Sequence, residues 1–412
     1  MMGIKRPELL APGGSLEKLK TAVMYGADAV YIGGEAYSLR AAAENFSLEE
    51  MREGLEFAHE RGKKVYLTAN ILPHNEDIAQ FEEYIKQIRP LGFDAVLVAD
   101  PGMFDTIRSL APELPVHIST QANNVNYRSA AFWHRLGAKR VVLARELSLS
   151  EIEEIRRNTP PELELEAFVH GAMCISYSGR CLLSNYMTHR DSNRGRCSHP
   201  CRWRYSLVEE KRPGQYMDVF ENDRGTFIFN SKDLCMIRHI PELIKSGITS
   251  LKLEGRVKTS YYVATVVGAY RREIDRYLED PENYQFSQES YEELLKVSHR
   301  PYTTGFYFDK PDEDSQVYAN SSYIRDYDLV AVVTGYDEKT GMATLAQRNR
   351  FFAGEEVEVI RPGKPYFKQV IGRMENGDGE EITVAPHAEM TVRTKLAQPV
   401  DSWAMVRRKK AD

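Results

Sequence analysis

The sequence predicts an α/β protein: a TIM-like (β/α)8 barrel with a long cysteine-rich insertion after its seventh strand, followed by a small C-terminal β-barrel. Strand-like and helix-like segments alternate from residue 8 onward, and one helix-to-strand junction recurs along the chain. After residue 323 the sequence pattern changes to short runs of β-branched residues separated by turns. We therefore place the barrel at residues 1–310, its insertion at about 172–245, and the second domain at 323–412.

The first βα unit shows how each element is recognised. Residues 8–12 (ELLAP) are a short apolar run, and Gly13 and Gly14 turn the chain. Ser15 is expected to be a helix N-cap, because its side chain can accept from the free backbone N–H groups of the first turn. Apolar residues then recur at helical spacing until Gly26, which ends the helix as a C′ glycine.

A junction of the same form recurs along the chain: a glycine that stops a helix, two or three linking residues, and an apolar strand. It begins at Gly26, Gly62, Gly92, Gly137 and Gly247. A parallel sheet with helical crossovers needs this junction repeatedly. The predicted strands lie at about 8–12, 29–33, 64–69, 95–99, 115–120, 140–144, 163–169 and 250–254.

Eight βα units are the number that closes a TIM barrel. An open, doubly wound sheet is the alternative, but no G-x-G-x-x-G follows the first strand. In a TIM barrel the chemistry lies where strands end and βα loops begin. Most of these positions here are glycine or polar, although any strand end that meets solvent tends to be so: Gly13/Gly14, Gly33/Gly34, Asn70, Asp100, Gln121, Arg145, His170 and Glu254-Gly255-Arg256.

The insertion holds all five cysteines, and four of them lie within 28 residues. Thiolate-rich sites select zinc, iron–sulfur or copper(I). The chain has no C-x2-C pair of the kind that zinc modules carry, and the wide spacing favours an iron–sulfur cluster held by a folded scaffold. Zinc and unliganded thiols stay open as alternatives. The cysteines are Cys174, Cys181, Cys197, Cys201 and Cys235.

The same insertion is basic. Residues 172–212 hold eight Lys or Arg against three acids, whereas the whole chain of 412 residues carries a net charge of −6. Arginines interleaved with aromatics hold phosphates and stack unpaired bases. A solvated face with its aromatics packed inward is the alternative. The candidate RNA-binding residues are Arg180, Arg194, Arg196, Arg202, Trp203 and Arg204.

Composition limits the class of protein. With 42% hydrophobic residues and mixed charges, the chain is neither disordered nor a globally basic nucleic-acid binder. The longest apolar stretch, at 261–270, is too short to span a bilayer, and the N-terminus lacks the apolar region of a signal peptide. We expect a cytoplasmic enzyme or RNA-handling protein without a membrane partner.

The C-terminal segment reads as a small β-barrel. Short β-branched runs are separated by turn signals at 337–341, 362–363 and 376–379. Residues 311–323 form the expected linker. Several residues of this domain are candidates for RNA contact, with surface charge as the alternative: Arg348, Arg350, Phe351, Phe352 and the tail 407–410.

Several motifs resemble those of the peptidase U32 family, and together they span residues 5 to 310. The central motif is Glu166-Ala-Phe168-Val-His170-Gly171-Ala-Met-Cys174, followed by Ser178-Gly179-Arg180-Cys181 and Ser184. The opening PELLAPGGSLEKLKTAVMYGADAVYIGG also matches, as do four later segments. These are Arg40 with Asn45-Phe46, ISTQANN at 118–124, SLKLEGRVK at 250–258, and TTGFY at 303–307.

The resemblance is strongest to the family's tRNA hydroxylation proteins. It implies oxygen-independent formation of 5-hydroxyuridine at the wobble position of tRNA, with prephenate as co-substrate and a [4Fe–4S] cluster. The tRNA anticodon loop is the implied partner, and a paralogous U32 subunit is a further candidate. The implied cluster ligands are Cys174, Cys181, Cys197 and Cys235, with Cys201 as a spare that can replace Cys197.

For that activity we expect the wobble uridine to be flipped into the barrel mouth, since chemistry on a base requires it out of the stack. His170 would move a proton with Glu254 as its partner. Asn70 and Gln121 would hydrogen-bond the uracil edge. A dicarboxylate such as prephenate needs cationic clamps, and the candidates are Arg145, Arg256, Lys258 and Arg40.

Two other functions remain open. The family's older label is collagenase-like peptidase, but the chain has no H-E-x-x-H and no G-x-S-x-G. Ser15 and Lys18 match S-x-x-K only formally, and Cys174 with His170 would be a thiol nucleophile with its base. The third function is a non-catalytic tRNA-binding subunit of a heteromeric hydroxylase.

Overall fold

The computed structural model describes residues 5–38, 45–174, 176–178, 180–203, 221–222, 225–226, 232–309 and 323–410. Within these residues eight parallel strands form a closed barrel, because β11 pairs with both β7 and β1. The predicted TIM-like fold is confirmed. The strands are β1 (Glu8–Pro12), β2 (Ala29–Gly33), β3 (Lys64–Thr68), β4 (Ala95–Val98), β5 (Val116–Ile118), β6 (Arg140–Val142), β7 (Glu164–Ala172) and β11 (Ser250–Leu253).

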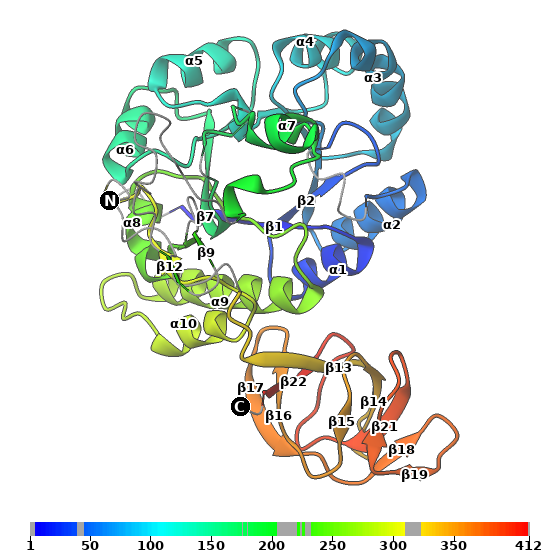
Figure 1. The fold of residues 1–412 in the computed structure, drawn as a ribbon. Helices are drawn as coiled ribbons and strands as arrows, with labels where there is room; N and C mark the ends of the chain where they lie inside the picture. The colour runs from blue at the N-terminus through cyan, green and yellow to red at the C-terminus, as the bar shows by residue number, and fades with distance from the viewer. Residues whose placement is uncertain are drawn as a thin grey trace.

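Helices alternate with these strands and cover the outside of the barrel (Figure 1). In the long α9, burial of nearly every residue of the first half shows that the helix lies between the strands and another layer. The helices are α1 (Leu16–Met24), α2 (Leu48–His59), α3 (Asn75–Ile88), α4 (Pro101–Leu110), α5 (Tyr127–Arg135), α6 (Leu149–Arg157), α8 (Ile240–Lys245), α9 (Ser260–Glu279) and α10 (Gln288–Leu295).

The local signals in the first unit act as predicted. Ser15 caps α1, and its Oγ accepts from the backbone N–H of Lys18 at 3.4 Å. Ser15 is therefore the N-cap of α1, as the sequence predicted. Gly26 adopts a φ of 104°, a left-handed conformation that favours glycine and reverses the chain toward β2.

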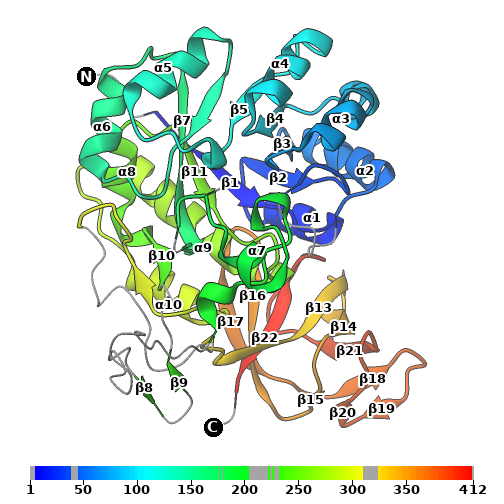
Figure 2. The same ribbon diagram turned by 45° about the horizontal axis from the view of Figure 1, so that its top comes forward.

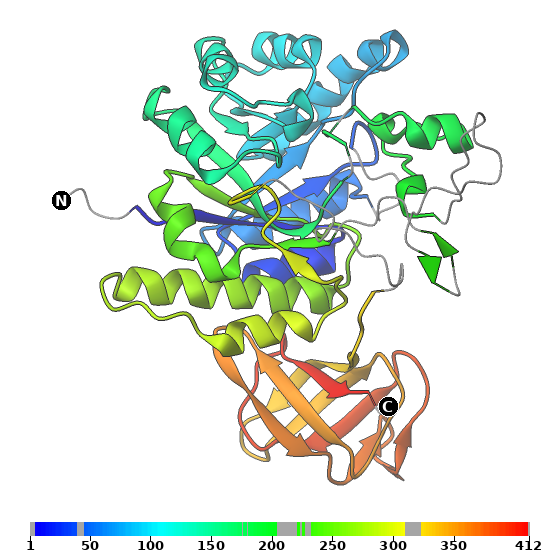
Figure 3. The same ribbon diagram turned by 60° about the vertical axis from the view of Figure 1, so that its left-hand side comes forward.

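The insertion between β7 and β11 adds structure that the sequence did not predict. A short strand, β10 (Asp233–Cys235), pairs antiparallel with the end of β7, with Cys235 opposite His170. β12 (Tyr302–Thr303) then pairs with β10. The helix α7 (Leu183–Thr188) lies across one end of the barrel (Figures 1 and 3). Strands β8 (Glu221–Asn222) and β9 (Gly225–Thr226) form a small hairpin.

The C-terminal domain is an antiparallel sheet with its own hydrophobic core, as the β-rich texture predicted. Its strand order is β17-β16-β22-β13-β14-β21-β18-β19, with a separate pair β15–β20. The strands are β13 (Tyr327–Asp337), β14 (Met342–Gln347), β15 (Phe351–Phe352), β16 (Glu356–Arg361), β17 (Lys364–Val370), β18 (Met374–Asn376), β19 (Glu381–Ile382), β20 (Val384–Ala385), β21 (Thr391–Lys395) and β22 (Met405–Lys409).

The small domain lies on the α9–α10 side of the barrel (Figures 1, 2 and 3), and a buried ionic cluster joins the two domains there. Arg407 of β22 is fully buried, and its Nη2 lies 2.6 Å from Glu293 of α10 and 2.7 Å from Glu358 of β16. Lys296 bridges the same two carboxylates at 2.9 Å each. Because these charges are taken out of water together, the small domain is fixed on the barrel at this point.

Candidate active site

The barrel mouth is the end at which the parallel strands finish, and the insertion begins there because it follows β7. Two hydrogen bonds are among the contacts that hold the insertion over the mouth. The backbone N–H of Leu72 donates to Asn193 O at 3.1 Å, and Asn123 Nδ2 donates to Ser178 O at 3.0 Å.

No helix in the described part of the chain is long and apolar enough to cross a membrane.

An amide cluster follows β3 and β5. Asn70 Nδ2 donates to both Ser119 Oγ and Gln121 Oε1 at 3.1 Å, and the Ser119 hydroxyl also donates to Gln121 Oε1. These bonds fix the amide of Asn70 with its Oδ1 as an acceptor that has no hydrogen-bond partner among the described residues. Buried polar atoms usually have partners, so this cluster is able to accept a donor from a ligand.

Arg145 and Glu254 form an ion pair at the ends of β6 and β11. The Nη2 of Arg145 lies 3.1 Å from Oε2 of Glu254, and its Nη1 donates to Ala172 O at 2.7 Å. The guanidinium also stacks on Phe168, 3.8 Å from the ring centre. Its Nε makes no hydrogen bond within the described residues. The structure therefore brings Glu254 to Arg145 instead of to the ring of His170.

Arg256 is buried at the mouth, 4% exposed, and is built into the barrel. Its guanidinium donates to Ser38 Oγ at 2.5 Å, Thr68 Oγ1 at 3.3 Å and Asn45 Oδ1 at 3.2 Å. A Cβ on Gly33 would collide with this guanidinium, which explains the glycine at the end of β2. Arg256 therefore organises the β2–α2 loop, and direct clamping of a substrate stays a prediction.

Lys258 lies beside the same rim. Its Nζ donates to Ser298 O at 3.2 Å and sits 3.8 Å from the ring centre of Tyr323. Burial lowers the pKa of Lys258, although Tyr323 and Asp233 oppose the shift. The ammonium is therefore a partly desolvated cation, a suitable partner for a carboxylate.

His170 is enclosed among aromatic rings and is 1% exposed. Burial lowers its pKa to about 3, with smaller effects from His299 and Lys258. The ring is thus neutral at pH 7, which differs from the proton carrier that we expected from an unperturbed histidine. Its Nδ1 lies 3.4 Å from Tyr270 Oη, and its Nε2 has no hydrogen-bond partner in the described chain.

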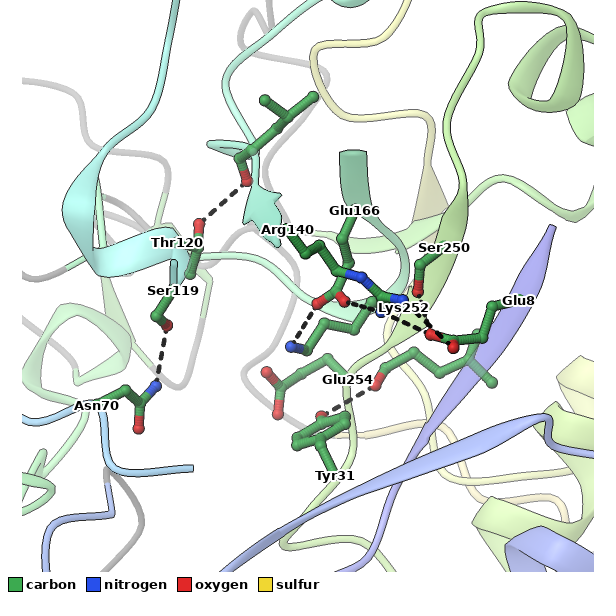
Figure 4. A network of polar contacts seen from close by, with 12 residues as sticks. Glu8, Tyr31, Asn70, Ser119, Thr120, Arg140, Glu166, Ser250, Lys252 and Glu254 are labelled. Carbon is green, nitrogen blue, oxygen red and sulfur yellow. Dashed lines mark hydrogen bonds and ion pairs between the residues drawn. The ribbon is translucent and has the colours of Figure 1, made fainter. Parts of the chain in front are cut away.

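Below the mouth, the barrel interior carries an ionic network that the sequence reasoning missed (Figure 4). Arg140 Nη1 lies 2.6 Å from Glu8 and 2.9 Å from Glu166, and Lys252 Nζ lies 2.7 Å from Glu166. Glu166 is fully buried and is neutralised by both cations. Charged residues inside otherwise apolar strands are the signal that would have found this layer.

The five cysteines differ in exposure and are not gathered into a metal site among the described residues. Within the described residues, no group of three or more His, Cys, Asp or Glu side chains is placed to hold a metal ion. Cys174 is exposed, Cys181 and Cys197 are partly exposed, and Cys201 and Cys235 are buried. Burial raises the pKa of Cys235 to about 12, so its thiol is protonated as placed. The described residues do not gather the predicted ligand set, and the assignment of a cluster to it stays a prediction.

The basic insertion exposes part of the predicted RNA-binding set. Arg180 and Arg196 are exposed, Trp203 is 41% exposed, and the neighbouring Tyr186 is 83% exposed. Arg194 differs, because it pairs with Glu76 at 3.1 Å and with Asp77 at 2.7 Å on α3. Arg40, Arg204 and the side chain of Arg202 lie outside the described residues.

Comparison with known proteins identifies the family. Residues 14–317 match Peptidase family U32, and residues 325–407 match the Peptidase family U32 C-terminal domain. The chain belongs to peptidase family U32. It is 46% identical to "tRNA hydroxylation protein P1" of Bacillus subtilis (strain 168), over 98% of this chain and 96% of the relative.

The names of two further relatives refer to RNA. The chain is 39% identical to "tRNA hydroxylation protein P" of Escherichia coli (strain K12), over 98% of this chain and 97% of the relative. It is 34% identical to "23S rRNA 5-hydroxycytidine C2501 synthase" of Escherichia coli (strain K12), over 67% of this chain and 40% of the relative. Two of these relatives are therefore named for tRNA hydroxylation and the third for a hydroxylated base of ribosomal RNA.

The peptidase machinery considered from the sequence of this U32 protein is not assembled. Cys174 is exposed whereas His170 is buried, and no hydrogen bond joins them in the described chain. Ser15 serves as the cap of α1. A nucleophile needs its base within hydrogen-bond reach, so neither pair supports proteolysis.

Proposed function

We propose that this protein is a tRNA-modifying enzyme that hydroxylates the wobble uridine to 5-hydroxyuridine, without dioxygen and with prephenate as co-substrate. The proposal rests on the similarity of this chain, over nearly its full length, to tRNA hydroxylation proteins. The polar barrel mouth is consistent with such an enzyme. The finer statements, uridine and prephenate, rest on the resemblance of the motifs to that branch of the U32 family.

The mouth offers hydrogen-bonding groups suited to a flipped base. Asn70 and Gln121 are oriented by Ser119, and the buried Oδ1 of Asn70 is left as an acceptor. Uracil presents a ring N–H between two carbonyl groups, and that N–H is the donor such an acceptor needs. A base held there would be recognised by its edge after leaving the stack.

A co-substrate is required by the balance of the reaction. Replacing the C5–H of uridine by C5–OH removes two electrons from the base, so an oxygen donor and an electron acceptor must be supplied. We assign both roles to the prephenate-dependent system. Cations that suit its carboxylates border the mouth: Arg145, whose Nε makes no hydrogen bond in the described residues, and the partly desolvated Lys258.

The iron–sulfur cluster is a separate part of the proposal. Four cysteines of the insertion are its proposed ligands, namely Cys174, Cys181, Cys197 and Cys235, with zinc as the alternative metal. A [4Fe–4S] cluster would supply redox chemistry or brace the insertion. Because the described thiols do not converge, no step of the proposed reaction is assigned to it. Iron and sulfide assays with an absorption spectrum of anaerobically purified protein test this part.

The experiment for the main proposal measures 5-hydroxyuridine in tRNA by mass spectrometry of nucleosides. Cells lacking the gene should lose the nucleoside, and expression of the wild-type chain should restore it. Asn70→Ala should restore less than a tenth, because the base-reading amide is gone, whereas the exposed Asn283→Ala should restore it fully. Unchanged 5-hydroxyuridine in the deletion strain would refute the proposal.

A second experiment separates an enzyme from an accessory subunit. Purified protein, tRNA from the deletion strain and prephenate are combined without dioxygen and without any paralogue. Formation of 5-hydroxyuridine supports a self-sufficient enzyme. Formation only after a paralogous U32 subunit is added supports the heteromeric form, in which this chain binds tRNA.

A further inference from the structure

A small crevice lies where the second half of α9 meets the hairpin that joins β16 and β17. It has a volume of about 310 Å³ and is lined by residues of both domains. In Figures 1 and 3 the small domain lies against the side of the barrel that α9 and α10 cover. Because α9 begins beside the mouth, its second half and the crevice lie toward the other end of the barrel. Four arginines and two carboxylates line it: Arg271, Arg272, Arg276, Arg361, Asp275 and Glu279.

Two of these arginines are already neutralised. Arg271 Nη1 lies 3.0 Å from Asp28, and its Nη2 lies 2.6 Å from Asp275. Arg276 Nε lies 3.7 Å from Glu273. These pairs account for Asp275, one of the two carboxylates in the lining. The two remaining arginines face one remaining lining carboxylate, Glu279, and leave an excess of positive charge in the crevice.

Arg361 is oriented by neutral groups. Its guanidinium donates to Pro365 O at 2.8 Å from Nη2 and to Pro399 O at 3.3 Å from Nη1. No carboxylate of the described residues lies within 4.0 Å of it. Carbonyl dipoles hold a guanidinium in place without cancelling its charge, so Arg361 is a pre-positioned cation.

Arg272 faces the crevice from α9 and is half-buried. Glu293, Glu289 and Glu273 act on it electrostatically, but none forms an ion pair with it in the described chain. Burial lowers the pKa of Arg272, and the three glutamates oppose this shift. A desolvated guanidinium gains more from an anion than one in open water does.

The two walls of the crevice are held at a fixed distance. Tyr25, which lines the crevice, donates from its hydroxyl to Trp403 O at 3.0 Å across the domain boundary. The buried pair of Arg407 and Glu293 lies in the same interface. A cation from each domain is therefore presented to one space without the need for domain closure.

We propose that this crevice binds a phosphate group between Arg272 of the barrel and Arg361 of the small domain. Guanidinium groups match phosphate oxygens in pairs, and two of them on facing walls suit one phosphate. The phosphate belongs either to the backbone of an RNA bound by the protein or to a free phosphorylated small molecule. The site goes beyond the proposed hydroxylation, because it lies on the outside of the barrel.

The test measures two affinities of the full-length protein: that for inorganic phosphate, against matched chloride, by titration calorimetry, and that for an unmodified tRNA transcript at several salt concentrations. Arg272→Gln and Arg361→Gln are compared with Arg373→Gln. Arg373 pairs with Glu375 and Glu381 on the small domain, outside the crevice. Arg361 is partly exposed at a strand end, so its variant will retain the fold.

The outcomes separate the two sources. We expect each crevice variant to weaken phosphate binding about tenfold, as the loss of one charged contact does, with Arg373→Gln unchanged. If the affinity for tRNA falls as well, and the slope of its dependence on salt concentration falls by the amount expected for about one phosphate contact, the phosphate is that of RNA. If tRNA binding is unchanged, the ligand is a phosphorylated small molecule. Wild-type protein that binds no phosphate, or variants that bind it equally, would overturn the proposal whether or not the protein hydroxylates tRNA.

Discussion

Arg145 Nη2 lies 3.1 Å from Glu254 Oε2, so the ends of β6 and β11 are joined by an ion pair at the barrel mouth. Both side chains are only partly exposed, at 11% and 14%. In such a site an ion pair is stronger than at the surface, and removal of one partner leaves the other charge unpaired and poorly hydrated. The pair is therefore expected to set the geometry of the mouth.

The first prediction concerns this pair. Arg145→Gln and Glu254→Gln should each lower the rate of 5-hydroxyuridine formation about 10- to 100-fold, the effect of losing one charge-assisted contact. The double variant should lose less than the product of the two, because each single change already breaks the pair. The measurement is kcat/KM for purified variants on tRNA.

The matched control is Arg373→Gln, since Arg373 pairs with Glu375 and Glu381 on the exposed surface of the small domain. Its kcat/KM should equal that of the wild type. Losses that multiply in the Arg145 and Glu254 double variant would show that the two residues act independently.

The second prediction concerns the clamp between Arg194 and α3. Arg194 bonds Glu76 and Asp77, and it fixes the insertion to the barrel rim. Arg194→Ala should speed proteolytic cleavage within the insertion several-fold while the free energy of global unfolding changes by less than about 1 kcal/mol, the range of exposed ion pairs. Limited proteolysis and denaturant unfolding measure the two quantities.

Arg196→Ala is the control for the clamp, because Arg196 is exposed and two residues away. It should weaken tRNA binding without changing the cleavage rate, whereas Arg194→Ala should do the reverse. Equal cleavage rates for the two variants would remove Arg194 from the clamp and return it to the RNA-binding set.

Much of the barrel was predictable because its signals are local. Each helix-stopping glycine, such as Gly26 or Gly247, precedes an apolar strand, and these junctions placed five of the eight strands of the described barrel. Short apolar runs placed the other three. β10 (Asp233–Cys235) was missed, although the equally short β6 (Arg140–Val142) was found. The antiparallel pairing of β10 with β7 is a long-range contact that leaves no periodic pattern nearby.

The candidate site was predictable only in part. Strand ends pointed to Asn70, Gln121 and Arg145, because a TIM barrel places polar groups there. Ser119 was missed, although it orients both amides. The sequence also could not distinguish a free cation from one already bound, since Arg256 differs from a substrate clamp only by partners far along the chain.

The third prediction is a pH dependence that arises from His117 in the barrel interior. Burial lowers the pKa of His117 well below 6.5, helped by Arg140 and Lys252. The folded protein keeps the ring neutral, whereas the unfolded chain takes up a proton below pH 6.5. Stability is therefore lost as pH falls, by about 1.4 kcal/mol per pH unit while the folded ring stays neutral.

His117→Gln should flatten this dependence by about one proton between pH 6.5 and pH 5, although it lowers stability at pH 7 by disturbing the packing against Tyr66. Denaturant unfolding at a series of pH values gives the slope. The exposed His387→Gln is the control and should leave the slope unchanged. Parallel curves for the wild type and His117→Gln would contradict the assignment.

The fourth prediction concerns the junction of the domains, where Arg407 is fully buried between Glu293 and Glu358. Arg407→Met removes the central cation and leaves the two buried carboxylates bridged by Lys296, with the Nζ of Lys368 3.8 Å from Glu358. Breaking a buried pair costs about 3–5 kcal/mol, and the two lysines should keep the loss near 3. Because Glu293 belongs to the barrel, the loss falls on the interface between the domains. Calorimetry should show two separate melting transitions for the variant and coupled unfolding for the wild type.

Arg408→Met, one residue along β22 and paired with Glu355 at the partly exposed side, should keep the coupling. A single transition at an unchanged temperature in Arg407→Met would mean that the apolar contacts alone hold the small domain on α9 and α10.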